Sequence, residues 1–232
     1  TACLAGVVDG DGKKVLVGGG FWYRNPGALG DQGQRSELGS GATDAGLIHD
    51  FDRDGRPDVL ATGGRAYGYQ TPFWEKLANW VAGSRDKEGN HGERLVWARN
   101  LGTGQFEILE NIQRASGDLL QGAAVLPAVG DEEERVLLSW HAAGEGIQSI
   151  TVPEEARHRE WAWSEFSSLS LDEALTVADV DADLNPDVIL GTVILFGREG
   201  GDWETVWIDD EGLKPDRHVV ADLNSDGLQD IV

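Results

Sequence analysis

The feature that most constrains this chain is an acidic pattern of nine residues that occurs three times, beginning at Asp50, Asp179 and Asp222. Each copy places oxygen-bearing side chains at its positions 1, 3, 5 and 9 and runs directly into an apolar, β-branched stretch. Hard oxygen ligands at alternate positions of a tight loop suit Ca²⁺, which takes six to eight oxygens at about 2.3–2.6 Å. Solvated, Asp-rich turns are the alternative interpretation. Three copies in register favour ion binding, because carboxylates packed this closely repel one another without a cation.

The pattern therefore predicts about three calcium sites, one for each copy. The predicted side-chain ligands are Asp50, Asp52, Asp54 and Asp58 in the first loop, Asp179, Asp181, Asp183 and Asp187 in the second, and Asp222, Asn224, Asp226 and Asp230 in the third.

The spacing of the copies predicts the fold. Asp179 and Asp222 are 43 residues apart, and the same interval counted back from Asp50 reaches a decayed copy in which Asp9 and Asp11 keep positions 3 and 5. We expect these two carboxylates to form only a weaker site. A further copy, beginning at Pro127, retains the apolar tail but not the ligands. Periods of about 40–50 residues with several short strands per unit are typical of β-propellers.

The predicted fold class is all-β, a β-propeller of four-stranded blades. The chain holds about four and a half units, at about 1–42, 43–117, 118–171, 172–214 and, in part, 215–232. In the fourth unit, apolar and β-branched runs predict strands at 174–178, 188–192, 193–196 and 203–208. We expect a larger propeller of about six to eight blades, which another chain or domain completes. The nine tryptophans are expected to pack between blades, with sugar stacking as the alternative.

One insertion, at about 65–92, interrupts the regular spacing of the copies, because the interval between copies there is some 30 residues longer than elsewhere. Thr71 as N-cap, Pro72 at the first helical position and Gly83 as a stop predict a short helix. Because the insertion follows the second strand, we expect it at the end of the blade opposite the ion loops. A helix that only caps a blade is the alternative. The candidate ligand-binding residues there are Arg65, Tyr67, Tyr69, Trp74 and His91.

The loops also resemble a known family. They are preceded by Val-Ala-Asp or His-Asp and followed by Asp-Val-Leu or Asp-Ile-Val, and with the segments Gly19–Gly27 and Trp97–Phe106 they resemble FG-GAP and VCBS repeats. These repeats occur in integrin α-subunit heads and in secreted bacterial proteins. The resemblance implies that the backbone carbonyl at position 7 is a further ligand. The residues at this position are Arg56, Asn185 and Leu228.

The second loop departs from the family pattern, because Leu184 stands where glycine normally supplies a positive φ. We expect Asn185, which tolerates that conformation, to absorb the strain, and the site to bind more weakly.

Composition and net charge limit the classes of partner and the cellular compartments that suit this chain. A net charge of −22 without a basic cluster disfavours binding to nucleic acid or anionic lipid. No apolar run is long enough for a membrane span, and the single Cys3 excludes an intrachain disulfide. Calcium loops of this type suit a secreted, extracellular or periplasmic protein, where free Ca²⁺ is near millimolar. The absence of Met and the first residue Thr indicate a processed or trimmed chain.

Catalysis finds little support in the sequence. The five histidines are scattered without metal-type spacing, and those that precede ion loops, His49 and His218, are expected to be structural. The favoured hypothesis is an extracellular calcium-binding module for recognition or adhesion, with a glycan or protein ligand. The alternative is the propeller of a secreted carbohydrate-active enzyme, such as a polysaccharide lyase or sugar dehydratase. The candidate residues for that chemistry are Tyr67, Tyr69, His91 and Arg94.

Overall fold

A computed structural model describes residues 3–28, 33–63, 94–130, 132–141, 144–171, 175–209 and 218–232. Within these ranges the chain is all-β and contains four four-stranded antiparallel sheets and one two-stranded sheet. The expected all-β class and the four-stranded sheets are confirmed. In the fourth sheet, each strand begins and ends within two residues of its predicted bounds.

Each four-stranded sheet is a meander whose strands pair in sequence order. The first contains β1 (Cys3–Gly6), β2 (Val15–Gly18), β3 (Phe21–Tyr23) and β4 (Arg35–Glu37). The second contains β5 (Asp44–His49), β6 (Asp58–Thr62), β7 (Leu95–Asn100) and β8 (Phe106–Leu109). The third contains β9 (Leu120–Leu126), β10 (Arg135–Trp140), β11 (Ile147–Thr151) and β12 (Ala162–Ser167). The fourth contains β13 (Leu175–Ala178), β14 (Asp187–Leu190), β15 (Val193–Gly197) and β16 (Trp203–Trp207), and the hairpin pairs β17 (Val220–Ala221) with β18 (Asp230–Ile231).

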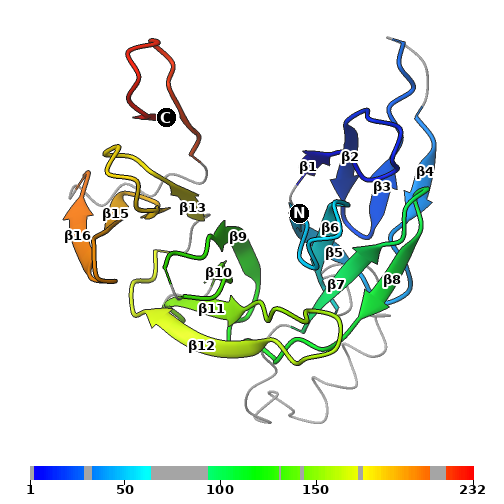
Figure 1. Ribbon diagram of the computed structural model, residues 1–232, viewed down its shortest axis with the longest axis horizontal. Coiled ribbons are helices and arrows are strands. Elements are labelled where there is room, and N and C mark those ends of the chain that lie inside the picture. Colours follow the sequence, from blue (N-terminus) through cyan, green and yellow to red (C-terminus); the bar gives the residue numbers. More distant parts are fainter. Residues whose placement is uncertain are drawn as a thin grey trace, which may run out of the picture.

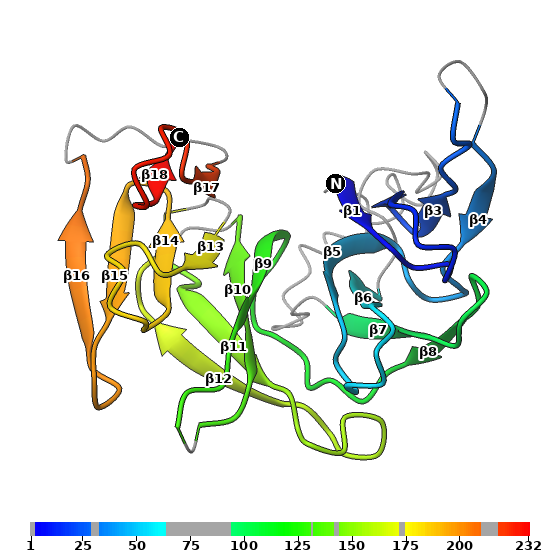
Figure 2. The ribbon, with the colours of Figure 1, turned by 45° about the horizontal axis from the view of Figure 1, so that its top comes forward.

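The four sheets follow one another along an open arc (Figure 1; Figure 2). Their first strands line the inner side, where β1 contacts β5, β5 contacts β9, and β9 contacts β13. The fourth strands β4, β8, β12 and β16 lie on the outer side of the arc in both views. The sheets are therefore arranged radially, with the first-to-second-strand loop at the corresponding place in each.

The hydrophobic core lies between neighbouring sheets and not within any one of them. Side chains alternate between the two faces of a strand. Val59 and Ala61 of β6 accordingly pack toward the first sheet, whereas Leu60 packs toward the third. In β10, Val136 joins the cluster shared with the second sheet and Leu137 the cluster shared with the fourth. Burial on both faces explains why these strands are continuous apolar runs rather than alternating ones.

Tryptophan supplies much of the packing between the second and third sheets. Trp97, Trp140 and Trp161 are fully buried there. The ring centroids of Trp97 and Trp161 are 5.3 Å apart. The ring centroid of Phe51, at position 2 of the first acidic loop, lies 5.1 Å from that of Trp161. The expected packing role is confirmed for these three tryptophans, whereas Trp207 at the outer strand β16 is 52% exposed.

The helix predicted at 71–83 and the ligand-binding candidates Arg65, Tyr67, Tyr69, Trp74 and His91 lie outside the described residues, so these predictions stay open. Among the residues that are described, no helix is long and apolar enough to cross a membrane.

Candidate metal centres

All acidic loops connect the first and second strands of a sheet. The loop starting at Asp50 joins β5 to β6, that starting at Asp179 joins β13 to β14, and that starting at Asp222 joins β17 to β18. The decayed copy containing Asp9 and Asp11 joins β1 to β2. The repeat inferred from spacing therefore corresponds to one structural position in successive sheets.

The loops share an unusual backbone conformation. Position 4 has a positive φ in each of these four loops: 75° at Gly10, 56° at Arg53, 60° at Ala182 and 62° at Ser225. Position 6 does as well, with 79° at Gly12, 86° at Gly55, 72° at Leu184 and 90° at Gly227. The expectation that Asn185 absorbs the strain of the second loop is wrong, because Leu184 itself takes the left-handed conformation. That conformation costs a residue with a Cβ roughly 1–2 kcal/mol.

In the three loops that begin with aspartate, the side chains at positions 1 and 9 hold this backbone in place. The position 1 carboxylate accepts the N–H groups of positions 5 and 6: Asp50 accepts them at 3.0 and 2.8 Å. The position 9 carboxylate accepts the N–H of position 2, at 3.2 Å for Asp58 and 2.7 Å for Asp187. Its other oxygen accepts an N–H from the third strand, that of Asn100 at 2.7 Å or Gly197 at 3.0 Å. Loop shape and carboxylate placement thus depend on each other.

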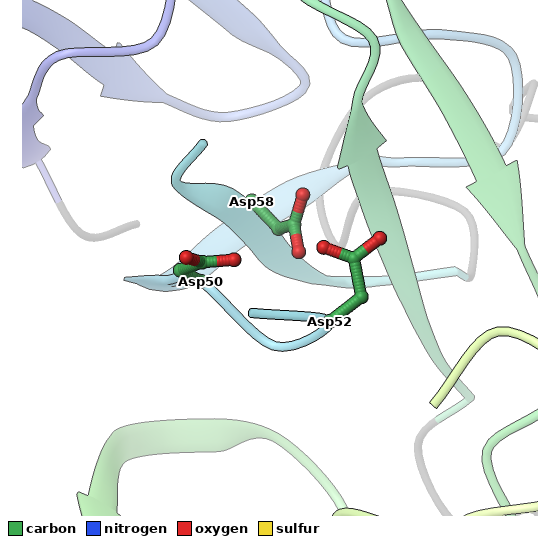
Figure 3. A group of neighbouring side chains, drawn as sticks. All are labelled: Asp50, Asp52 and Asp58. Carbon is green, nitrogen blue, oxygen red and sulfur yellow. The ribbon is translucent and has the colours of Figure 1, made fainter. Parts of the chain in front are cut away.

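Two of the loops gather three carboxylates each. Asp50, Asp52 and Asp58 each offer one oxygen, and these oxygens all lie within 4.8 Å of one another; Asp179, Asp181 and Asp187 do the same. Figure 3 shows the first group converging on one side of its loop. Two oxygens that bind the same Ca²⁺ at about 2.4 Å lie no more than about 4.8 Å apart. Each pair of oxygens in both groups meets this limit, so both groups could hold a metal ion.

Burial makes an uncompensated charge in these groups costly. Asp58 and Asp187 are fully buried. Burial raises the pKa of Asp58 from 3.8 to about 7, the Asn100 N–H opposes the shift, and the charge of Asp52 adds to it. Burial likewise raises the pKa of Asp187. The Oδ1 of Asp52 is buried without a hydrogen-bond partner. A cation at this point would relieve both the repulsion and the unpaired oxygen.

The position 5 aspartates are arranged differently. The backbone N–H of Arg56 donates to Asp54, and that of Asn185 donates to Asp183. Their outer oxygens contact arginines that the sequence had not singled out, Arg99 for Asp54 and Arg198 for Asp183. The structure therefore brings positions 1, 3 and 9 together, while position 5 lies outside the group of three and shares an arginine with position 3.

The third loop repeats the hydrogen bonds in an exposed setting. Asp222 accepts the N–H groups of Asp226 and Gly227 at 3.1 and 2.9 Å, and Asp230 accepts that of Leu223 at 2.9 Å. The N–H of Leu228 donates to Asp226 at 2.8 Å. Within the described part of the chain, only the first two loops contain three acidic side chains that could hold one metal ion, and the third loop has Asn224 at position 3.

The ligand-poor copy at 127–134 has a structural contact in place of an acidic cluster. Its Glu134 lies 3.2 Å from Nε2 of His49, which immediately precedes the first acidic loop. The hydrogen bond to Glu134 raises the pKa of His49, against the opposing effect of burial. The contact links the second sheet to the third, which fits the structural role expected of His49.

Asn100 is a further residue whose role the sequence did not reveal. It is buried, its amide donates to the carbonyl oxygens of Val8 and Pro57, both at 2.9 Å, and its backbone N–H donates to Asp58. It thereby joins the loop of the first sheet to that of the second. Its place within the segment Trp97–Phe106 gave no indication of this role.

Comparison with protein-family models, with curated proteins and with solved structures found no match for this chain.

Proposed function

We propose that this chain is a calcium-binding module whose ions brace the loops between the first and second strands of radially arranged sheets. The observation that carries the proposal is the pair of three-carboxylate groups, Asp50, Asp52 and Asp58 in one loop and Asp179, Asp181 and Asp187 in another. Each is built by the same backbone conformation, which supports one function for both. The exposed loop at Asp222 is proposed as a third, weaker site.

We further propose that the sheets are blades of a β-propeller. Support comes from the contacts among the first strands β1, β5, β9 and β13 and from the packing of consecutive sheets face to face. Apolar side chains are exposed toward both ends of the arc, with Leu16 53% and Val219 64% accessible. Additional blades from another chain or domain would cover them. Light scattering after size exclusion tests this, and a stable monomer with the mass of one chain contradicts it.

The biological role proposed for the module is recognition or adhesion outside the cell or in the periplasm, with a glycan or protein as ligand. The resemblance to FG-GAP and VCBS repeats supports this role, as does the suitability of such loops for Ca²⁺ at near-millimolar concentrations. Screening the protein on glycan and protein arrays, with Ca²⁺ and with chelator, tests it. Ligand capture that disappears on chelation is expected, and the absence of any ligand on both arrays contradicts the role.

Thermal unfolding tests the calcium proposal itself. A ligand that binds only the folded state at 100 times its dissociation constant stabilises by about 2.7 kcal/mol per site. Ca²⁺ added to chelated protein should therefore raise the melting temperature. The rise should shrink in Asp52→Ala and in Asp181→Ala, but not in Glu154→Ala, which removes an exposed carboxylate from another turn. An unchanged melting temperature in the unmodified protein would contradict calcium binding.

A further inference from the structure

An arginine in the third strand, or directly after it, contacts the loop between the first and second strands in three of the four four-stranded sheets. In the second sheet, Arg99 of β7 donates from Nε to Asp52 at 2.5 Å and from its terminal nitrogen to Asp54 at 3.0 Å. In the fourth, Arg198 lies just after β15 and donates to Asp181 at 2.6 Å and Asp183 at 3.2 Å.

The first sheet repeats the arrangement. Arg24, directly after β3, donates from Nε to Asp9 at 3.1 Å and lies 3.9 Å from Asp11. In each sheet the carboxylates that receive the arginine are those at positions 3 and 5.

The meander explains how separate sequence segments reach one place. The third strand pairs with the second, which begins at position 9, so the residue opposite position 9 lies beside the loop. Arg99 follows Ala98, the partner of Val59, and Arg24 follows Tyr23, the partner of Leu16. Arg198 lies further along its chain, next to Gly197, whose N–H reaches position 9. The three arginines therefore share their position beside the loop and their charge, but they do not lie at a fixed distance along the sequence.

The first sheet indicates what the arginine does. Its loop has Val7 at position 1 and Val15 at position 9, so two of the four oxygen-bearing side chains are missing. The backbone nevertheless has the same two positive φ values as the acidic loops. The Asp9 side chain is only 1% exposed and is paired with Arg24. Here a guanidinium compensates the buried carboxylate in a loop that lacks half of its ion ligands.

In the second sheet, the carboxylate of Asp52 belongs to the three-carboxylate group and also pairs with the arginine. Arg99 donates a hydrogen bond to Oδ2 of Asp52, whereas Oδ1 of Asp52 is buried and has no hydrogen-bond partner. Both side chains are largely buried, with 16% and 13% exposed. Their attraction is therefore less screened than that of a surface pair. Arg198 and Asp181 are more exposed, at 34% and 33%.

We propose that Arg99 and Arg198 are internal counter-cations that keep their loops folded without Ca²⁺ and lower the affinity for the ion, an inference that rests on the proposed calcium binding. Arg24 performs only the first role. The guanidinium attracts the loop most strongly when no ion is bound. Once Ca²⁺ neutralises the carboxylates, the attraction weakens and the dication repels the arginine. The arginine thus stabilises the ion-free state more than the bound state, which is a negative coupling between the two cations.

Calorimetric Ca²⁺ titration and urea unfolding in chelator of the unmodified chain, Arg99→Gln and Arg198→Gln test the proposal. Arg99→Gln should bind Ca²⁺ about tenfold more tightly, within the usual range of such couplings, and unfold at a lower urea concentration in chelator. Arg198→Gln should change both in the same directions but less, because its pair is more exposed. Arg99→Lys, which keeps the charge, should retain most of the Ca²⁺ affinity and of the stability in chelator that the unmodified chain has. Arg114→Gln, a charge-matched change at an exposed residue outside the loops, should alter neither.

The opposite signs of the two effects distinguish this role from a purely structural one. An arginine that merely positions the ligands would give weaker binding in Arg99→Gln, and that result overturns the proposal. Unchanged stability in chelator for both glutamine variants also overturns it. If the unmodified chain takes up no Ca²⁺, the proposed function fails, and the part of this inference that concerns affinity fails with it. Lowered stability of the variants in chelator would then still support a loop-holding role for the arginines.

Discussion

Replacing Trp161 with alanine tests whether the second and third sheets pack face to face through a shared core. Trp161 is fully buried, and its ring lies 5.3 Å from that of Trp97 and 5.1 Å from that of Phe51. Its Nε1 donates to the carbonyl of Ala156 at 2.8 Å, but that oxygen also accepts the amide of Asn111 at 2.7 Å and so keeps a partner. The cost therefore comes mainly from lost burial and the cavity. Substitutions of this kind cost about 3–5 kcal/mol.

The assay is urea unfolding followed by far-ultraviolet circular dichroism, in saturating Ca²⁺, for the unmodified chain, Trp161→Ala and Trp207→Ala. Trp207 is the matched control, because the same change is made at a residue that is 52% exposed. We expect a loss of about 4 kcal/mol for Trp161→Ala and of less than about 1 kcal/mol for Trp207→Ala. Equal losses in the two variants would refute the packing of these sheets described above.

Two further predictions concern the acidic loops. Leu184→Gly should raise stability by about 1 kcal/mol, because Leu184 is 89% exposed and has a φ of 72° that glycine adopts freely. The matched change Gly55→Leu should lower stability, and urea unfolding measures both. In chelator, stability should rise by up to about 1.4 kcal/mol per unit as the pH falls from 7 to 5, because the pKa of Asp58 is raised to about 7 and the folded state binds this proton more tightly than the unfolded chain. Over the same interval the affinity for Ca²⁺ should fall, because the proton and the ion compete for the Asp58 carboxylate. Calorimetric titration at each pH measures this affinity, and a constant value would contradict the prediction.

The features that depend on local sequence could be predicted. Apolar runs gave the strands of the fourth sheet, and the acid spacing gave the position of the loops between first and second strands. Both follow from interactions among neighbouring residues, such as the Asp50 carboxylate accepting N–H groups four and five residues away. The conformation at Leu184 was mispredicted for a related reason. The hydrogen bonds to Asp179 impose the loop geometry on the sixth position whichever residue stands there.

The features that depend on distant segments could not be predicted. Arg99 reaches Asp52 across 47 residues, and the amide of Asn100 reaches Val8 across 92. No spacing rule connects these pairs, because an insertion separates the second and third strands of that sheet, and because sheet-to-sheet packing decides which side chains meet. Only the recurrence of an arginine near the third strand of several units could have suggested the pairing.

The proposed function requires both acidic groups to bind Ca²⁺, and counting bound ions is the most direct test. Equilibrium dialysis followed by elemental analysis should find at least two Ca²⁺ per chain, one for each group. Asp52→Ala and Asp181→Ala suit this purpose, since position 3 pairs with arginine, whereas the aspartates at positions 1 and 9 also hold the loop backbone. Each variant should lose one ion, and Glu154→Ala none. A folded chain that retains no stoichiometric Ca²⁺ at millimolar concentration would contradict the central claim.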